Sequence, residues 1–356
     1  MKSPHFWSCE PGAFSLALSP LAAIYSVVGK LRHNFATPSH CGRPVICIGN
    51  INLGGTGKTP VTLMIAELLT GAEHRPAVLS RGYGGSQKGP LHVLPDRHSA
   101  MEVGDEPLMM SAHVPVIVGA DRHRSARLAI HDQHICADIL LMDDGLQNPA
   151  LARAYNLAVI DAEVGFGNGR VFPAGPLREP PEYALRRLDG IMLVHAENAD
   201  RADLRPDIQA FVGMCRRQDL DVFDCHMQPE SALTPPQAER VVSYCGIGRP
   251  QKFFDTIDSL GFVHVHAATF ADHHHFTERD AEHLLALAAT HDAKLITTRK
   301  DITRLQNAPS NSLAAKLCAA SHVVDITCRL AQPDAFRKAL EAAISEDMMS
   351  RLYTNL

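Results

Sequence analysis

The stretch Gly49-Asn50-Ile51-Asn52-Leu53-Gly54-Gly55-Thr56-Gly57-Lys58-Thr59-Pro60 decides the fold. It follows a β-branched run, 44–48, and opens a helical pattern that extends from Lys58 to about Leu69. A strand, a glycine-rich turn and a helix N-terminus in this order surround a phosphate with backbone N–H groups. The stretch therefore predicts a P-loop that binds ATP through Asn52, Leu53, Gly54, Gly55, Thr56, Gly57, Lys58 and Thr59.

One position departs from the standard P-loop pattern. Asn52 stands where the first glycine is usual, six residues before Lys58. The glycines that follow Leu53 still permit a close approach of the backbone to a phosphate. Lys58 is expected to reach the terminal phosphates during catalysis, and the Thr59 hydroxyl is expected to bind Mg²⁺.

A P-loop also needs an acid on a neighbouring strand to hold the metal ion. The apolar run 138–142 ends in the adjacent carboxylates Asp143 and Asp144. Their side chains leave opposite sides of an extended chain, so one can face Mg²⁺ while the other meets water or a neighbouring loop. The sequence leaves open which of the two lies closer to the metal.

Composition narrows the function. The net charge of −5 gives no general reason to bind nucleic acid, and the nine cysteines include no CxxC pair, which disfavours a zinc ribbon and suits a reducing compartment.

A guanine-specific switch is disfavoured because the nearest approach to its base-binding motif, Thr298-Arg299-Lys300-Asp301, has the lysine one place too late. A partitioning ATPase would carry an extra lysine where this chain has Leu53. A small-molecule kinase is the class that remains.

The N-terminal segment is apolar. No charged residue occurs between Glu10 and Lys30, which is close to the ~20 residues that span a bilayer. Lys30, Arg32 and His33 follow, which favours a cytoplasmic body with the segment either spanning once or lying in the membrane interface. A buried N-terminal helix is the alternative.

The remaining pattern predicts an α/β fold, a P-loop NTPase-like, doubly wound, mostly parallel sheet with a second, smaller α/β domain. Strands are expected at 44–48, 77–80, 114–118, 138–142, 157–161 and 191–195, and in a second set at 241–245, 262–266, 294–297 and 323–326. A proline-bearing connection is expected at 228–238. The predicted units are an apolar membrane-associating segment, 1–35, a P-loop kinase domain, 36–228, and a C-terminal domain, 229–356.

A set of ordered motifs resembles the tetraacyldisaccharide 4′-kinase family. Beyond the P-loop they are Ser80-Arg81-Gly82-Tyr83-Gly84-Gly85, Gly104-Asp105-Glu106-Pro107, Asp143-Asp144-Gly145-Leu146-Gln147, Gly167-Asn168-Gly169, Pro173-Ala174-Gly175-Pro176-Leu177-Arg178-Glu179, Gly246-Ile247-Gly248-Arg249-Pro250, Phe270-Ala271-Asp272-His273-His274 and Thr297-Thr298-Arg299-Lys300-Asp301. The resemblance implies transfer of the ATP γ-phosphoryl group to the 4′-hydroxyl of an acylated glucosamine disaccharide 1-phosphate, giving lipid IVA. It places the enzyme at the cytoplasmic face of the bacterial inner membrane, with ATP and Mg²⁺ as cofactors and no obligate protein partner.

Site roles follow from the motifs. Asp105 is the expected base, because its flanking glycine and proline indicate a loop that presents the carboxylate, and the resemblance pairs it with His273. Glu106 is expected to touch Mg²⁺, with a solvated loop acid as the alternative. Arg178 is the expected catalytic cation and Arg122 and Asn168 the substrate contacts; the resemblance adds Gln147 at the nucleotide.

Several positions depart from the family pattern. Asn148 follows Gln147 where histidine is usual, Ala154 replaces an aspartate, and Arg299 replaces a glutamate. We assign no role to these three positions. The adjacent histidines His273, His274 and His275 are not expected to form a metal site, because consecutive side chains of a strand cannot all face one ion.

Overall fold

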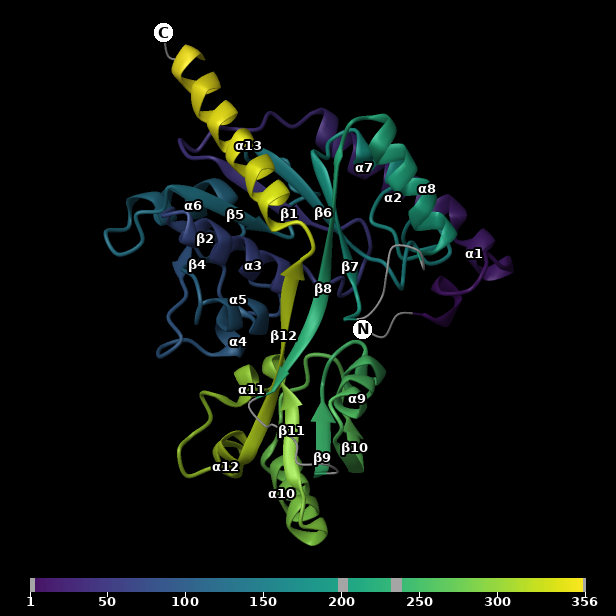
Figure 1. Ribbon diagram of the computed structural model, residues 1–356, viewed down its shortest axis with the longest axis vertical. Helices are drawn as coiled ribbons and strands as arrows, with labels where there is room; N and C mark the ends of the chain where they lie inside the picture. The colour runs from purple at the N-terminus through teal and green to yellow at the C-terminus, as the bar shows by residue number, and fades with distance from the viewer. Residues whose placement is uncertain (1–3, 198–203, 232–238, 355–356) are drawn as a thin grey trace.

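The strands form one 12-stranded sheet in the order β10-β9-β11-β12-β8-β7-β6-β1-β5-β2-β4-β3 (Figure 1). The structure, a computed structural model, describes residues 4–197, 204–231 and 239–354. Neighbouring strands are parallel except in the pairs β3–β4 and β8–β12. The predicted α/β class and mostly parallel sheet are confirmed. The strands are β1 Val45–Gly49, β2 Pro76–Ser80, β3 Leu91–His92, β4 Val116–Val118, β5 Ile139–Asp143, β6 Tyr155–Asp161, β7 Gly190–His195, β8 Asp221–Ser231, β9 Arg240–Cys245, β10 Val263–Thr269, β11 Lys294–Thr298 and β12 Ser321–Leu330.

Two lobes share this sheet. The first lobe contains β1 to β7, whose central strands are fully buried because helices cover both faces. One face carries α3 (Lys58–Gly71), α4 (Ala100–Val103) and α5 (Asp105–Met110), and the other carries α6 (Arg122–His131), α7 (Pro181–Leu185) and α8 (Pro206–Arg217). β1 lies between β5 and β6, so the loop after β1 sits at the carboxyl edge of the sheet, where open α/β sheets bind ligands.

The second lobe is built on β9, β10, β11 and the adjoining half of β12. Its helices α10 (Glu278–His291), α11 (Arg299–Leu305) and α12 (Leu313–Ala320) pack on one face, and α9 (Pro250–Ser259) packs on the other. Capping side chains define where these helices begin: Thr277 for α10, Thr298 for α11 and Ser312 for α12. The start of α11 places its first turn beside α5 of the first lobe.

A two-stranded antiparallel ribbon, β8 with β12, joins the lobes (Figure 1). Within the predicted connection 228–238, residues 228–231 belong to strand β8 of this ribbon; residues 232–238 lie outside the described part of the chain. Pro229 is tolerated in this strand because β7 pairs with β8 only as far as His226, so the strand edge beyond that point needs no N–H donor.

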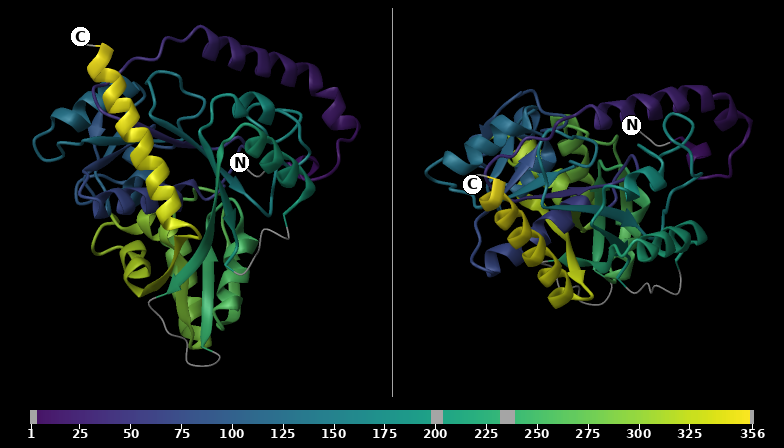
Figure 2. Two further views of the ribbon diagram at one scale, coloured as in Figure 1. Left: turned by 45° about the horizontal axis from the view of Figure 1, so that its top comes forward. Right: turned by 90° about the horizontal axis from the view of Figure 1, so that it is seen from above.

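The C-terminal helix α13 (Pro333–Thr354) returns to the first lobe. Phe336, Leu340 and Ile344 are buried in the core that also contains β1 and α3. Figure 2 shows this helix lying along the first lobe, away from the strands of the second. Helix α13, which falls within the predicted C-terminal unit 229–356, thus packs with the first lobe.

The N-terminal segment forms a single 3-10 turn (His5–Trp7), α1 (Ala13–Ala17) and α2 (Ser19–Asn34). Within the described residues, no helix has the length and apolar character needed to cross a membrane. Ala22 is the one buried residue of α2, which runs along the outside of the first lobe (Figure 2). The alternative of a buried N-terminal helix is wrong, since most of its apolar side chains are exposed.

Candidate active site

The predicted P-loop connects β1 to α3. Gly57 has φ +84°, in the left-handed region, so glycine suits the conformation of this turn; a Cβ added there would also lie 2.6 Å from Met227 Cε. Lys58 is the first residue of α3, and Thr59 is buried in the same turn. Sequence reasoning therefore located the loop, the lysine and the hydroxyl correctly relative to the strand and the helix.

Asn52 and Leu53 contact the protein itself. The Asn52 amide donates to Gly165 O at 2.6 Å, and the Leu53 N–H donates to Pro176 O at 2.7 Å. These bonds fasten the start of the loop to the segment that follows β6. The direct nucleotide contacts predicted for the two residues are therefore not supported, and the exposed part of the loop is Gly54 and Gly55.

Asp144 is held by two cations at the end of β5. Arg178 Nη1 donates to both carboxylate oxygens at 2.9 Å, and Lys58 Nζ lies 3.6 Å from Oδ1. The residue has φ +51°, in the left-handed region that aspartate tolerates better than most residues. Asp144 thereby ties the P-loop lysine to Arg178.

Asp143 has the opposite environment. It is 5% exposed, and its nearest polar contact is the Ser80 hydroxyl at 3.5 Å from Oδ2. Burial raises the pKa of the Asp143 carboxyl to about 7; the negative charge of Glu106 adds to this, and Lys58 only partly opposes it. A buried acid that lacks a full counter-charge is suited to receive a cation.

The geometry permits Mg²⁺ at this edge of the sheet without a protein-only cage. Among the described residues, no three His, Cys, Asp or Glu side chains are grouped to hold a metal ion. Mg²⁺ in P-loop sites takes a hydroxyl, one or two carboxylates and phosphate oxygens, with water completing the shell. Thr59, Asp143 and Asp144 supply the hydroxyl and the carboxylates, so the residues fit the ion.

Gln147 is hydrogen-bonded to Arg178. Its amide nitrogen donates to Asn50 O at 3.0 Å and to Glu179 Oε1 at 2.9 Å, and its oxygen accepts from Arg178 Nη1 at 3.1 Å. Because both ends of the amide are engaged, the predicted contact with the nucleotide is not supported. Gln147 instead orients Arg178.

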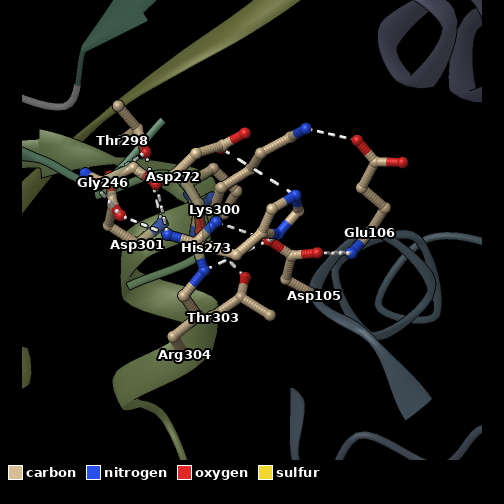
Figure 3. Close-up of polar contacts among 11 residues, drawn as sticks. Asp105, Glu106, Gly246, Asp272, His273, Thr298, Lys300, Asp301, Thr303 and Arg304 are labelled. Atoms are coloured by element: carbon tan, nitrogen blue, oxygen red, sulfur yellow. Dashed lines mark hydrogen bonds and ion pairs between the residues drawn. The ribbon is translucent and has the colours of Figure 1, made fainter. Parts of the chain in front are cut away.

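Asp105 and His273 come from different lobes and meet in the structure. His273 Nδ1 lies 3.0 Å from Asp105 Oδ2 (Figure 3). Asp105 does not sit in a loop, as the sequence indicated; it is the first residue of α5, where Gly104 with φ +91° turns the chain into the helix. Pro107 is compatible with this helix because it falls in the first turn, where a missing N–H is harmless.

Charges around the pair decide its protonation. Burial alone would raise the pKa of the Asp105 carboxyl, but the hydrogen bond with His273 and the charges of Arg304 and Lys300 lower this pKa well below its usual range. The same hydrogen bond raises the pKa of His273, against a smaller opposing effect of burial. Asp105 is therefore an anion, and His273 is the member of the pair that can gain or lose a proton.

Glu106 is paired with Lys300 of α11 (Figure 3). The ammonium group of Lys300 lowers the pKa of the Glu106 carboxyl more than burial raises it. The Mg²⁺ contact predicted for Glu106 is not supported, because its carboxylate is taken by Lys300. Glu106 still lies near enough to Lys58 and Asp143 for their charges to influence one another, which places the Asp105–His273 pair beside the P-loop.

Arg122 and Asn168 have structural roles. Arg122 is 3% exposed and donates to the backbone carbonyls of Ser80 and Gly119, so the structure does not support the predicted substrate contact. The Asn168 side chain bonds Ala174 O, Phe6 O and Arg170 N, and so fixes the N-terminal segment to the first lobe. The Asn168 amide is engaged at both ends, whereas the buried Nε of Arg122 has no hydrogen-bond partner among the described residues.

Three cations of the second lobe escaped the sequence analysis. Arg304 donates to Asp105, Lys300 to Glu106, and Arg249 donates to Gly55 O in the P-loop at 2.5 Å and to Asp161 at 2.7 Å. Lys300 and Arg249 lie within quoted motifs but were given no function. Their partners are far away in sequence, so spacing carries no signal for these contacts.

Comparisons with known proteins agree on one family. The model of the tetraacyldisaccharide-1-P 4′-kinase family matches residues 14–345. A tetraacyldisaccharide 4′-kinase of Parvibaculum lavamentivorans is 39% identical over 89% of this chain and 90% of its own length. Another, of Methylorubrum extorquens, is 41% identical over 96% of this chain and 99% of its own.

The fold has a counterpart among solved structures. The crystal structure of the "apo" form of LpxK from Aquifex aeolicus, in complex with ATP, superimposes with a TM-score of 0.70. It covers 93% of this chain and 99% of the other, at 24% identity, and so supports the fold. With the family match over most of the sequence, the conclusion is direct: the chain belongs to the tetraacyldisaccharide-1-P 4′-kinase family and is a kinase of lipid A biosynthesis.

Proposed function

We propose that the chain phosphorylates the 4′-hydroxyl of tetraacyldisaccharide 1-phosphate with Mg-ATP, and that Asp105 and His273 act together as the base. The observation that supports these roles is the meeting of the pair across two lobes, with Nδ1 and Oδ2 3.0 Å apart beside the P-loop. The relative from Aquifex aeolicus, described as a complex with ATP, supports the choice of nucleotide.

The first lobe binds the triphosphate. The N-terminus of α3 and the backbone of Gly54 to Gly57 receive the phosphates, and Lys58 contributes positive charge there. Arg178 stabilises the charge that develops on the transferred group, since its contact with Asp144 holds it beside Lys58. Mg²⁺, bound by Thr59, Asp143 and Asp144, would neutralise phosphate charge. Its ligand Asp143 would then ionise.

The second lobe contributes the base. A neutral His273 that donates its Nδ1 proton to Asp105 leaves Nε2 as the acceptor. The proton of the sugar hydroxyl passes to Nε2 as the oxygen bonds to the γ-phosphorus, and the Asp105 carboxylate stabilises the imidazolium that forms. His273 is 40% exposed while Asp105 is 5% exposed, so the imidazole is the member that a substrate can reach.

In this proposal the enzyme encounters its lipid substrate at a membrane surface. Leu21, Ile24, Val28 and Leu31 of α2 are each about half or more exposed. Lys30 and Arg32 lie near the end of the helix, where they suit anionic lipid headgroups. We propose that α2 lies in the interface at the cytoplasmic face of the inner membrane and brings the site to a substrate that stays in the bilayer.

The test uses the full chain with lipid A disaccharide 1-phosphate in detergent micelles. Asp105→Asn and His273→Gln are each expected to lower kcat by about 10²- to 10⁴-fold, the usual contribution of a positioned base. ATP binding, followed by fluorescence titration, should change little because neither side chain belongs to the P-loop. His275→Gln is the matched control, since His275 is an exposed histidine two residues from the pair.

Two results would contradict the assignment. Near wild-type kcat in either variant would remove the pair from the base role. Hydrolysis of ATP without any phosphorylated lipid in the wild type would point away from lipid kinase chemistry and toward a partitioning-type ATPase.

A further inference from the structure

Arg304 of α11 reaches the carboxylate of Asp105 from the opposite lobe. Its Nε and Nη2 both lie on Oδ2, at 3.2 and 2.5 Å, and that oxygen also faces His273 Nδ1 (Figure 3). The Arg304 side chain is 2% exposed. A fully buried guanidinium on the oxygen that orients the proposed base is a specific arrangement, because arginine in such a place has no water to satisfy its donors.

Arg304 is itself anchored to the frame that carries His273. Its Nη1 donates to Gly246 O at 2.8 Å, and the same carbonyl accepts the backbone N–H of His273 at 3.1 Å. Nη1 also lies 2.7 Å from Asp301 Oδ1, which accepts the Gly246 N–H at 3.0 Å. One guanidinium therefore fixes Asp105 relative to the backbone of its partner histidine.

The other charged groups nearby have different partners. Lys300 is bound to Glu106, and Asp272 lies on the far side of the imidazole, 3.9 Å from Nε2. His273 also has φ +58°, a backbone conformation that needs support from its surroundings. Among the described residues, Arg304 is the cation that directly contacts Asp105.

We propose that Arg304 is a positioning residue for the kinase reaction: it holds Asp105 in the place where the carboxylate orients the imidazole of His273 toward the acceptor hydroxyl. The inference rests on the proposed function of the Asp105–His273 pair. Arg304 does not touch ATP or lipid in this arrangement; it acts through Asp105. Its removal should slow the chemical step and leave substrate binding nearly unchanged.

The experiment compares three full-length variants in the micelle assay. Arg304→Gln removes the charge, and Arg304→Lys keeps the charge without the planar fork. Arg299→Gln is the matched control: Arg299 lies on the same helix and forms an ion pair with Asp325, with Nε 2.7 Å from Oδ1, but has no contact with the pair. Asp105→Asn and His273→Gln are assayed in parallel, and thermal unfolding is recorded for every protein.

Arg304→Gln should lower kcat by about 10- to 100-fold, the range typical of residues that orient a functional side chain. The KM values for ATP and lipid should stay within about twofold. Arg304→Lys should recover part of the lost kcat, and Arg299→Gln should match the wild type. If Arg304→Gln does not fold, Arg304→Lys is used in its place. This variant should show a reduced kcat and unchanged KM values.

Unchanged kcat in Arg304→Gln overturns the proposal. So does a loss of activity that follows the unfolding temperature alone and is not relieved by lysine, since that pattern describes a stabilising ion pair. If Asp105→Asn and His273→Gln retain activity, the base assignment fails first. If they lose activity while Arg304→Gln does not, the role of Arg304 alone is refuted.

Discussion

Asp143 and Asp144 are neighbours in sequence with opposite electrostatic surroundings. Asp144 lies against Lys58 and Arg178, whereas Asp143 is buried with Ser80 as its nearest polar contact. The pKa of Asp144 is lowered because these two cations outweigh burial, and the pKa of Asp143 is raised to about 7. A bound divalent cation would therefore stabilise the ionised carboxylate of Asp143 more than that of Asp144.

This difference predicts a stability effect of Asp143→Asn. The folded pKa of Asp143 lies above its unfolded value near 4, so ionisation of this carboxyl destabilises the fold progressively as pH rises from about 4 to 7. The amide cannot ionise, and the variant should gain up to about 4 kcal/mol in free energy of unfolding at pH 8, measured without Mg²⁺. The gain should vanish at pH 4, and activity should be lost.

Urea unfolding at the two pH values measures this effect. Asp96→Asn, at an exposed position, is the control and should behave as the wild type. A variant that is no more stable than the wild type at pH 8 would show that Asp143 is not strained by its burial.

Sequence reasoning at this scale succeeded where the chemistry is local. The P-loop residues, the acids after β5 and the Asp105 motif were predicted because each belongs to a short pattern. The ligand contacts predicted for Arg122 and Gln147 gained no support, because type and spacing do not reveal whether a polar side chain already bonds other parts of the protein. Arg304 was missed because its partner Asp105 is 199 residues away.

At the scale of elements, α2 combines an exposed apolar surface with a basic end. Ile24 and Val28 are 62% and 60% exposed, and side chains four residues apart lie on the same face of a helix. The sequence predicted an apolar segment correctly but left its packing open, because the same composition suits a core helix, a span or an interfacial helix. Burial excludes the core helix, because Ala22 alone is buried within α2.

The double substitution Ile24→Ser, Val28→Ser should weaken binding to vesicles of anionic phospholipid by about 10- to 100-fold. The variant lacks two apolar side chains that the wild type would transfer from water into the membrane interface. Activity on substrate in detergent micelles should be retained, since α2 contributes no residue to the proposed base or P-loop. Vesicle sedimentation measures the binding. Val263→Ser, Ile326→Ser is the control, because both residues are exposed but belong to β10 and β12 instead of α2. Equal loss in both pairs would refute a specific role for α2.

For the whole molecule, the sequence predicted two sets of α/β alternations but not their fusion into one sheet. The alternating pattern identifies strands one at a time, whereas the β8–β12 pairing joins residues about 100 positions apart, such as Thr327 and Gln228. The return of α13 to the first lobe was missed for the same reason. An amphipathic helix indicates that it must be covered but does not indicate by which core.

The two lobes meet at the active site through ionic contacts, and Arg249 is the one that touches the P-loop. It donates to Gly55 O and to Asp161, a carboxylate that is only 4% exposed. Arg249 itself is 41% exposed, so solvent screens part of the interaction. We expect Arg249→Ala to reduce the binding free energy of ATP by about 1 kcal/mol, which corresponds to roughly a fivefold rise in the KM for ATP.

Arg249→Ala should leave kcat at saturating ATP close to the wild-type value, because the Asp105–His273 pair keeps its own partners. Arg337→Ala, an exposed position on α13 whose charge pairs with Asp334, is the control and should change neither constant. Steady-state kinetics with varied ATP separates the outcomes. A fall in kcat at constant KM would place Arg249 in the chemical step, whereas a rise in KM shows that the second lobe helps the P-loop to retain ATP.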